Sequence, residues 1–454
     1  MQSVACAVSV PRVLAPSEDA KLGNLWRWFR CHGGRAPRIT VRTAGGLRGV
    51  YAIADIADDE TILYVPRRLL LTMDVARDGR YGRMMRAAGV ELNDEAHLGL
   101  FLTEVRRDGG FWAPYVANLP ITFDDLPICW DAAEWRELDG SCTQRMARGL
   151  FDNLRADFRR VRAVLPAAER MGLREFAWGW MAASTRCFNL SVDGRPMPTM
   201  VPMADMMNCA DEEHAGWSGD HSAALEYKAK PGRRLCAEAQ VTASYGPAPN
   251  TMRLAQYGFT LSGNPLDEVR VHVALPQGHF AAGGPELHDG IAAGHAYDVR
   301  ADARHDGLRR LLSFLRLTSL PSEDVARRHP ALRCGDPRRL PPLDPCNERI
   351  ALERLRAACA QRLDLFEHTI ERDDELLAKG TLHDRHRAAI VARRGEKKVL
   401  LDLVAFASAA IPLLALPTEA REEALARGEA AAGPMAGWFG QCLAAFGVRT
   451  AQAV

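Results

Sequence analysis

The chain lacks three features that would place it in a special class: a long uninterrupted apolar segment, a paired-cysteine motif and an excess of one charge. Its longest apolar stretch, residues 399–416, contains Asp402 and Pro412, so it predicts a buried helix rather than a membrane span. The eleven cysteines are scattered, with no CxxC pair, which argues against a disulfide framework and a zinc site. We therefore expect free thiols in a reducing compartment.

The charges are balanced, with 58 Lys and Arg against 57 Asp and Glu. A balanced chain has no overall field that would draw it to nucleic acid or to a membrane surface, so we expect neither partner. The 454 residues, 47% of them apolar, are enough for two or three globular domains. We expect a monomer.

The expected cellular compartment depends on how the N-terminal residues are interpreted. The first 17 residues contain Ser3, Ser9 and Arg12 but no acidic residue, a composition also found in organelle transit peptides. A disordered terminus is the favoured interpretation. The cytoplasm or the nucleus is therefore the first expectation, and the plastid the second.

Hydrophobic periodicity predicts an α+β fold. Residues 39–65 alternate apolar and polar side chains around Gly45-Gly46, which predicts short antiparallel strands. Residues 73–180 have helical spacing instead, and short strands return at 201–203, 225–227 and 241–245. We divide the chain into an N-terminal tail (1–23), a strand-rich domain with a helical insert at about 73–180 (24–262), and an all-helical domain (263–454).

The helical domain has two clear helices. Residues 348–366 carry one apolar stripe after a predicted cap at Asn347, and residues 386–410 form a second long helix after a glycine cap at Gly380. The charged stretch 371–398 is expected to be a solvated helical surface, with docking of a protein substrate as the alternative.

Three motifs carry chemistry, and each is weak in isolation. Gly45 to Gly49 is followed by a strand, but it lacks the spacing of a dinucleotide-binding loop and is more often only a hairpin turn. Residues 201–209 run from a strand into Asp205 and Asn208, a pattern also typical of a capped turn. Residues 245–259 place Tyr245, Tyr257 and Phe259 around turns, as in ordinary core packing.

Together and in this order the motifs resemble the SET-domain protein methyltransferases, in the branch of the Rubisco large-subunit lysine methyltransferase and the actin-histidine methyltransferase. That branch has a GRG(V/L)xA hairpin, an aromatic segment ending in LP, an arginine, a (V/I)PxxDxxNH strand and a YGxxxN…GF motif. The matching positions in this chain are Arg48–Ala52, Phe111–Pro120, Arg186, Val201–Cys209 and Tyr245–Phe259. Residues 347–349, 376–382 and 395–400 resemble that branch's helical substrate-binding domain. The resemblance implies a β-rich SET fold followed by this all-helical domain.

The resemblance also implies a function and a set of site residues. The chain would transfer methyl groups from S-adenosylmethionine to a lysine of a protein substrate, with Tyr245 as the catalytic residue and Arg186 binding the carboxylate of the methyl donor. Substrate binding would fall to Phe188 and Tyr257. Cofactor binding would fall to Arg48, Gly49, Arg186, Asp205, Met206, Met207, Asn208, Cys209 and Phe259.

Two alternatives stay open. Protein-histidine methylation is one, although the aromatic side chain of Phe188 favours the aliphatic stem of a lysine. A catalytically inactive SET fold that serves as an interaction module is the other, because Cys209 stands where the motif has histidine. No metal is expected, since the following histidines have no ligand spacing: His272, His279, His288 and His295.

Overall fold

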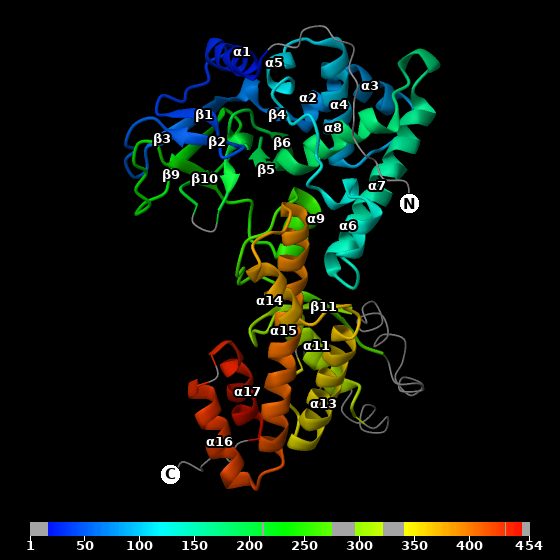
Figure 1. Ribbon diagram of the computed structural model, residues 1–454, viewed down its shortest axis with the longest axis vertical. Coiled ribbons are helices and arrows are strands. Elements are labelled where there is room, and N and C mark those ends of the chain that lie inside the picture. Colours follow the sequence, from blue (N-terminus) through cyan, green and yellow to red (C-terminus); the bar gives the residue numbers. More distant parts are fainter. Residues whose placement is uncertain (1–16, 211–212, 275–295, 321–339, 432, 447–454) are drawn as a thin grey trace. The chain divides into compact units, whose positions relative to one another are not determined.

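The computed structural model describes residues 17–210, 213–274, 296–320, 340–431 and 433–446 (Figure 1). The chain forms two compact units. The first unit comprises Met1–Ala133, Met146–Ala248 and Arg253–Leu261, and the second comprises Glu134–Arg145, Pro249–Met252 and Ser262–Val454. The domain limits predicted from the sequence remain our proposal for the chain's organisation.

Up to residue 257 the chain forms a first group of strands, a run of helices and a second group of strands. Their bounds are α1 Glu18–Cys31, β1 Ile39–Ala44, β2 Leu47–Ala52, β3 Thr61–Pro66, β4 Leu71–Thr72, α2 Met73–Asp78, α3 Arg80–Ala87, α4 Asp94–Asp108, α5 Ala113–Val116, α6 Ala132–Arg136, α7 Cys142–Val164, α8 Leu173–Arg186, β5 Cys187–Val192, β6 Arg195–Met200, β7 Asn208–Cys209, β8 Ala215–Gly216, β9 Ala224–Ala229, β10 Gln240–Ala243 and α9 Asn250–Tyr257.

The main sheet joins strands from both sides of the helical insert. Its order is β1-β2-β10-β8-β9-β3, with β7 also paired to β10. β2 pairs antiparallel with β10, where Val50 lies opposite Val241, and β3 pairs antiparallel with β9. The early and late strands therefore form one sheet, and the predicted helical insert between them is confirmed. Gly45 and Gly46, which join β1 to β2, have φ of 59° and 83°, as a tight hairpin turn requires.

The expected strand at 201–203 is wrong. The strand in this region, β6, ends at Met200, because Pro202 has no N–H for a ladder and Met203 takes a left-handed φ of 74°. A 3₁₀ turn, Ala204–Met206, then leads into β7.

The hairpin of β5 and β6 was not predicted from the sequence. Asp193 and Gly194 form its turn, with φ of 53° and 69°. An Asp-Gly pair between two strands favours this two-residue turn. The signal was therefore present in the sequence.

The helices of the first unit pack closely around α4 and α8. Leu98 and Leu102 of α4 are fully buried, as their spacing predicted. Gly99 lies against Gly179 of α8 so closely that a Cβ on either would overlap the other's backbone. Helix α1 begins at Glu18, because the Ser17 hydroxyl accepts the Ala20 N–H and caps the helix.

The second unit is helical, as predicted, with one added two-stranded sheet. Its elements are β11 Val269–His272, β12 Ala296–Val299, α11 Asp306–Leu317, α13 Pro345–Leu363, α14 Ile370–Ala378, α15 Asp384–Leu414, α16 Thr418–Ala431 and α17 Ala436–Phe446. Leu352, Leu355 and Cys359 of α13 are fully buried. The predicted cap at Asn347 is wrong, because Asp344 caps α13 and accepts the Asn347 N–H at 2.9 Å.

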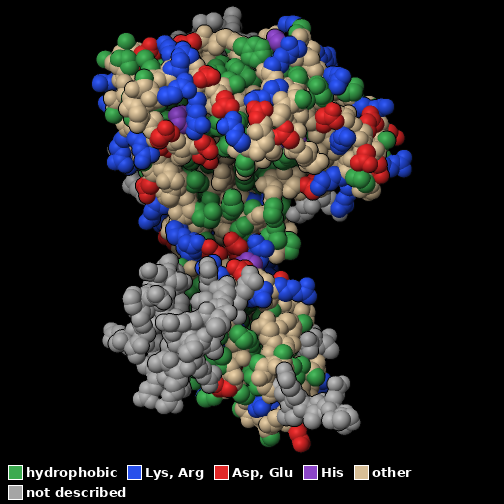
Figure 2. Space-filling model, turned by 180° about the vertical axis from the view of Figure 1, so that it is seen from behind, with side chains coloured by type: hydrophobic (Ala, Val, Ile, Leu, Met, Phe, Trp, Pro, Cys, Tyr) green, Lys and Arg blue, Asp and Glu red, His purple; other side chains and the backbone are tan. Residues whose placement is uncertain are grey.

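From the sequence we expect balanced surface charge, no membrane span and no metal site. On the face in Figure 2, Lys and Arg side chains are interspersed with Asp and Glu. Within the described ranges, no helix combines the length and apolar character that a membrane span needs, and no group of three or more His, Cys, Asp or Glu side chains could hold a metal ion. His272 lies on β11, whereas His279, His288 and His295 fall outside the described residues.

Candidate functional site

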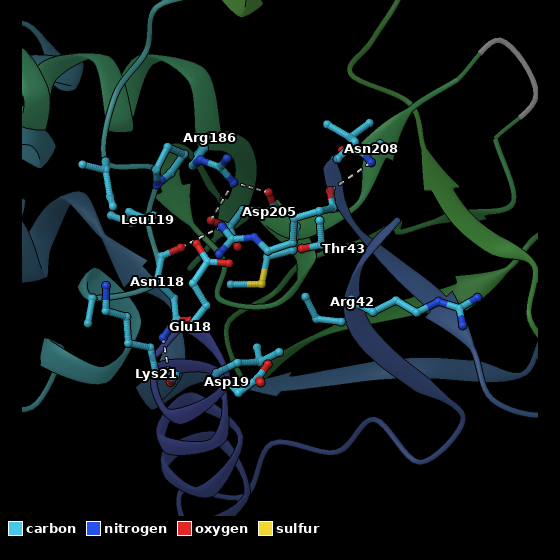
Figure 3. A pocket seen from close by; sticks show the side chains of 18 of the residues that line it. Glu18, Asp19, Lys21, Arg42, Thr43, Asn118, Leu119, Arg186, Asp205 and Asn208 are labelled. Carbon is cyan, nitrogen blue, oxygen red and sulfur yellow. Dashed lines mark hydrogen bonds and ion pairs between the residues drawn. The ribbon is translucent and has the colours of Figure 1, made fainter. Parts of the chain in front are cut away.

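A cavity of about 700 Å³ in the first unit brings half of the predicted site residues together (Figure 3). Its walls come from the start of α1, the β1–β2 hairpin, the segment after α5, the end of α8 and the turn before β7. Six predicted residues line it: Arg48, Arg186, Asp205, Met206, Asn208 and Tyr245. Residues more than 190 positions apart in the sequence thus meet at one cavity.

Arg186 and Asp205 form the polar floor of this cavity. Arg186, the last residue of α8, donates through Nη1 to the Asp205 carbonyl at 2.6 Å and lies 3.6 Å from its Oδ2. The Tyr115 hydroxyl donates to the same Oδ2 at 2.9 Å. Among the described residues, Arg186 Nε and Asp205 Oδ1 have no hydrogen-bond partner although both are buried. A buried donor and a buried acceptor without partners indicate a place for a polar ligand.

A second guanidinium adds positive charge to the site. Arg48 donates through Nη2 to the Asn118 carbonyl at 2.7 Å. Burial, and next the charge of Arg186, lower the pKa of Arg48. Burial raises the pKa of Asp205, against the opposing effect of Arg186. Arg186 pairs with the buried Asp205 carboxylate, and Arg48 lies close enough to be influenced by both charges, an arrangement suited to a ligand that brings a carboxylate of its own.

Gly49 and Asn208 hold β2 and β7 close together at the cavity. Asn208 Nδ2 donates to the Arg48 carbonyl at 3.2 Å. A Cβ on Gly49 would lie 3.0 Å from Asn208 Nδ2 and would overlap the side-chain amide of Gln240. Because Gly49 has no side chain, the backbone of β2 can approach β7 and the ligand cavity.

Tyr245, the predicted catalytic residue, is a neutral hydrogen-bond donor. Its hydroxyl donates to the Met207 carbonyl at 2.9 Å, and burial raises its pKa to about 12. At neutral pH the phenol is therefore protonated, and it cannot serve as a phenolate base. Its ring packs edge-on against Tyr257 and Phe259, at centroid distances of 5.3 and 5.9 Å.

A second aromatic group lies beside this one. Phe188 packs on Trp217 at 5.3 Å, and Trp217 packs on Tyr227 at 5.1 Å. The Tyr227 hydroxyl is buried and, within the described part of the chain, has no partner. Burial, and next the nearby Tyr245, raise the pKa of Tyr227. We call Phe188, Trp217 and Tyr227 the aromatic row.

Some predicted residues do not line the cavity itself. Cys209 lies on β7, where its Sγ accepts a hydrogen bond from Arg253 at 3.1 Å. Tyr257 and Phe259 stand behind Tyr245, and Phe188 belongs to the aromatic row. The residues outside the lining are Gly49, Met207, Cys209, Phe259, Phe188 and Tyr257.

Several residues at the site were not predicted from the sequence. Glu18 and Asp19 of α1 line the cavity, although residues 1–23 were assigned to a tail. Asn118 contributes through its main-chain carbonyl, which no residue pattern reveals. Tyr115 lies inside the recognised segment Phe111–Pro120, so its position was visible but its contact with Asp205 was not. The free hydroxyl of Tyr227 had no signal beyond a strand pattern.

Comparisons with known proteins show what the chain is similar to. Residues 289–400 match the family described as Rubisco LSMT substrate-binding. The chain is 26% identical over 402 residues to the [fructose-bisphosphate aldolase]-lysine N-methyltransferase, chloroplastic, of Arabidopsis thaliana, a match that covers 83% of this chain and 81% of the plant protein. It is 24% identical to the actin-histidine N-methyltransferase of Canis lupus familiaris, over 80% of this chain and 64% of that protein.

A solved structure shows the fold. The chain superposes on the crystal structure of the SET domain of LSMT bound to lysine and AdoHcy with a TM-score of 0.73 and 23% identity. The match covers 88% of this chain and 93% of that one. The predicted SET fold and helical C-terminal region are therefore confirmed.

Proposed function

We propose that this chain, a SET-fold protein with a Rubisco LSMT substrate-binding region, is a protein-lysine N-methyltransferase that uses S-adenosylmethionine. Similarity over most of its length to a lysine N-methyltransferase supports the activity. The observation that carries the proposal is the cavity that Arg186, Asp205 and Tyr245 line together, with Arg186 Nε and Asp205 Oδ1 buried and, among the described residues, without hydrogen-bond partners. We assign the catalytic role to Tyr245.

The residues present fit S-adenosylmethionine. Its carboxylate would be held by Arg186, whose Nε lacks a partner among the described residues, and its ammonium by the acidic groups on the wall, Asp205 and Glu18. Asn208 and the backbone of Arg48 and Gly49 would contact the rest of the molecule. A cavity of about 700 Å³ is within the usual range for a ligand of this size. When bound, the cofactor supplies an electrophilic methyl group on a cationic sulfur.

The chain's own residues must then bring a lysine to this methyl group in its neutral form. A lysine with a pKa near 10.4 needs roughly 4 kcal/mol to lose its proton at pH 7. Desolvation and a nearby positive charge both favour the neutral amine. Tyr245 is protonated, so we assign it to positioning the reacting groups rather than to proton abstraction. The rings of Tyr257 and Phe259 pack against Tyr245 and give it apolar surroundings, which favour the neutral amine.

Lysine is proposed over histidine because of the aromatic row. Phe188 and Trp217 offer aromatic faces, which bind an aliphatic stem and attract an ammonium cation. An imidazole would require a hydrogen-bond partner instead. The second candidate, histidine methylation, is supported by the similarity to an actin-histidine N-methyltransferase.

Methyl transfer into proteins tests the proposal. Purified chain is incubated with cell lysate and tritium-labelled S-adenosylmethionine, and the labelled residue is identified by mass spectrometry. Label on lysine supports the proposal, and label on histidine favours the second candidate. Tyr245→Phe should lower the turnover number at least tenfold, because the hydroxyl that contacts Met207 is lost. Unchanged turnover would remove Tyr245 from the catalytic role.

A binding measurement separates an enzyme from an inactive interaction module. Saturating S-adenosylmethionine should raise the unfolding temperature, because a ligand of the folded state stabilises it. An unchanged unfolding temperature would favour the interaction module. That alternative is suggested by Cys209, which stands where the motif has histidine.

Partners and compartment complete the proposal. We propose a monomer that acts on a protein substrate, without nucleic acid or membrane. The name of the Arabidopsis relative, chloroplastic, supports the plastid, whereas the composition favours the cytoplasm or the nucleus. Fluorescent tagging at the C-terminus in the source cell distinguishes these compartments.

A further inference from the structure

The loop that carries Tyr245 belongs to neither a strand nor a helix. β10 ends at Ala243 and α9 begins at Asn250, so residues 244–249 connect the two. Pro247 and Pro249 have no N–H to donate, and Gly246 adopts a left-handed φ of 90°. The position of Tyr245 therefore depends on what holds the carbonyls of this loop.

Arg253 of α9 holds two of them. Its Nη2 donates to the Gly246 carbonyl at 3.1 Å, directly after Tyr245, and its Nε donates to the Ala248 carbonyl at 3.2 Å. The residue is only 5% exposed. A planar guanidinium with fixed donors fixes both carbonyls in one geometry, which a flexible ammonium would not.

The same side chain reaches the opposite wall of the site. Arg253 Nη1 donates to Cys209 Sγ at 3.1 Å, and Cys209 follows Asn208 on β7. The Tyr245 hydroxyl in turn donates to the carbonyl of Met207. The contacts therefore form a closed ring that runs from Tyr245 through Gly246, Arg253 and Cys209 back to Met207.

An ion pair does not account for the burial of Arg253. In the described parts of the chain, no carboxylate lies within ion-pair distance of its guanidinium. Buried arginines are almost always paired with an acid, because an isolated charge is costly to desolvate. Here the compensation comes from two loop carbonyls, one sulfur and the face of Phe259, 5.9 Å from the guanidinium carbon.

We infer that Arg253 is a positioning residue for Tyr245, and that Cys209 is its anchor on β7. Arg253 does not line the cavity, so it acts on the reaction through the loop and not through contact with the reacting atoms. Cys209 is the position where the SET motif has histidine. In this chain its sulfur accepts the hydrogen bond from Arg253 Nη1. The inference rests on the proposed methyltransferase function and adds a residue to it.

Kinetics of Arg253→Met test the inference. We expect the turnover number to fall about 10- to 100-fold, as a displacement near 1 Å of a reacting group does. The dissociation constant of S-adenosylmethionine, measured by calorimetry, should change less than about threefold, since Arg186 and Asn208 remain. Equal losses of turnover and of cofactor affinity, or turnover within twofold of the unmodified chain, would overturn the inference.

Arg107→Met is the matched control. Arg107 also donates to two main-chain carbonyls, those of Glu169 at 3.1 Å and Arg170 at 3.3 Å, but it lies outside the cavity lining. Its loss should lower the unfolding temperature without lowering the turnover number. If both variants slow turnover alike, general destabilisation explains the effect and Arg253 has no special role.

Cys209 variants give a test that does not require Arg253→Met to fold. Cys209→Ser keeps an acceptor for Arg253 and should therefore lose less turnover than Cys209→Ala. Equal turnover in the two variants would contradict the role of the sulfur.

Hydrogen exchange separates this inference from the proposed function. In Arg253→Met and Cys209→Ala, the peptide that spans residues 244–257 should exchange faster than in the Arg107→Met control. This readout needs no methyl transfer, so an inactive unmodified chain would refute only the proposed function. Unchanged exchange in this peptide would refute the positioning role even if the chain is an active methyltransferase.

Discussion

Both units of the molecule bury carboxylates, but they satisfy them to different degrees. In the second unit, Glu348 accepts from Arg316 and Trp438, and Asp373 accepts from Arg393 and Lys397, so every carboxylate oxygen has a partner. In the first unit, Asp205 has Tyr115 and Arg186 on one oxygen and, among the described residues, no partner on the other.

The difference distinguishes a buried carboxylate that stabilises the fold from a buried carboxylate that can bind a ligand. A buried ion whose hydrogen bonds are all made inside the protein stabilises one packing of helices and has no capacity left for a ligand. A buried ion with an open acceptor at a cavity is unfavourable until something polar occupies the cavity. The contrast predicts that removing Asp373 should affect folding, whereas changes around Asp205 should affect ligand affinity.

The largest effect should come from Asp373→Ala. The substitution leaves Arg393 and Lys397 buried without their common acid, so the free energy of unfolding should fall by about 3–5 kcal/mol. Urea denaturation measures the loss. The neighbouring Asp374, half-exposed and paired with Arg394, is the control, and Asp374→Ala should cost less than about 1 kcal/mol. Similar losses in the two variants would remove the distinction between the buried and the exposed pair.

Glu396 should make stability depend on pH with an unusual sign. Its carboxylate accepts from the Cys142 N–H at 2.8 Å and from Arg362 at 3.0 Å, and burial raises its pKa to about 7 from an ordinary 4.5. Between these two values the folded chain holds a proton that the unfolded chain has lost. The stabilisation from Glu396 is therefore complete below about pH 4.5 and is lost as the pH rises through about 7.

The comparison with Glu396→Gln isolates this contribution. Glutamine does not titrate, so the difference in unfolding free energy between the unmodified chain and the variant should fall by on the order of 3 kcal/mol from pH 4.5 to 7. Denaturant titrations at four pH values measure it. A constant difference would mean that the carboxylate stays ionised and that its pairing with Arg362 outweighs burial.

Local patterns were enough to predict most of the fold. The β1–β2 hairpin, the helical insert and the long C-terminal helix each follow from periodicity and glycine turns, because these elements are determined by neighbours in the sequence. The prediction of a strand at 201–203 was wrong. Its apolar residues fit a strand, but Pro202 and the left-handed Met203 end one. The β5–β6 turn was overlooked although Asp193-Gly194 indicates it.

The site was predictable only where a residue type carries the contact. Arg48, Asn208 and Tyr245 were found through their motifs, and they meet at one cavity. The Asn118 carbonyl and the fork of Arg253 act on or through the main chain, so no side-chain pattern marks them. The stretch 371–398 was expected to be a solvated surface or a docking face, yet Asp373, Lys397 and Glu396 are buried there. Only tertiary pairing distinguishes such residues from an exposed charged helix.

At the ligand cavity, Arg186→Gln should mainly lower the affinity for S-adenosylmethionine. The amide is neutral and shorter than the guanidinium side chain and cannot pair with a carboxylate, so the affinity for S-adenosylmethionine should fall about 10- to 100-fold. The free energy of unfolding without ligand should change far less than in Asp373→Ala. Calorimetry with the cofactor and urea denaturation without it measure the two quantities. A large loss of stability with unchanged affinity would assign Arg186 to the structural class.

Gly49→Ala should give the smallest effect and sharpen the contrast further. The added Cβ would press on the Gln240 amide and on Asn208, which can move at the cost of their contacts at the cavity. We expect cofactor affinity to fall about fivefold and the free energy of unfolding to fall by less than about 1 kcal/mol. Gly23→Ala is the control, because a Cβ there meets open space in α1 and should stabilise the helix by about 0.5–1 kcal/mol. If Gly49→Ala binds the cofactor as well as Gly23→Ala does, the close approach of β2 and β7 at Gly49 serves packing rather than ligand binding.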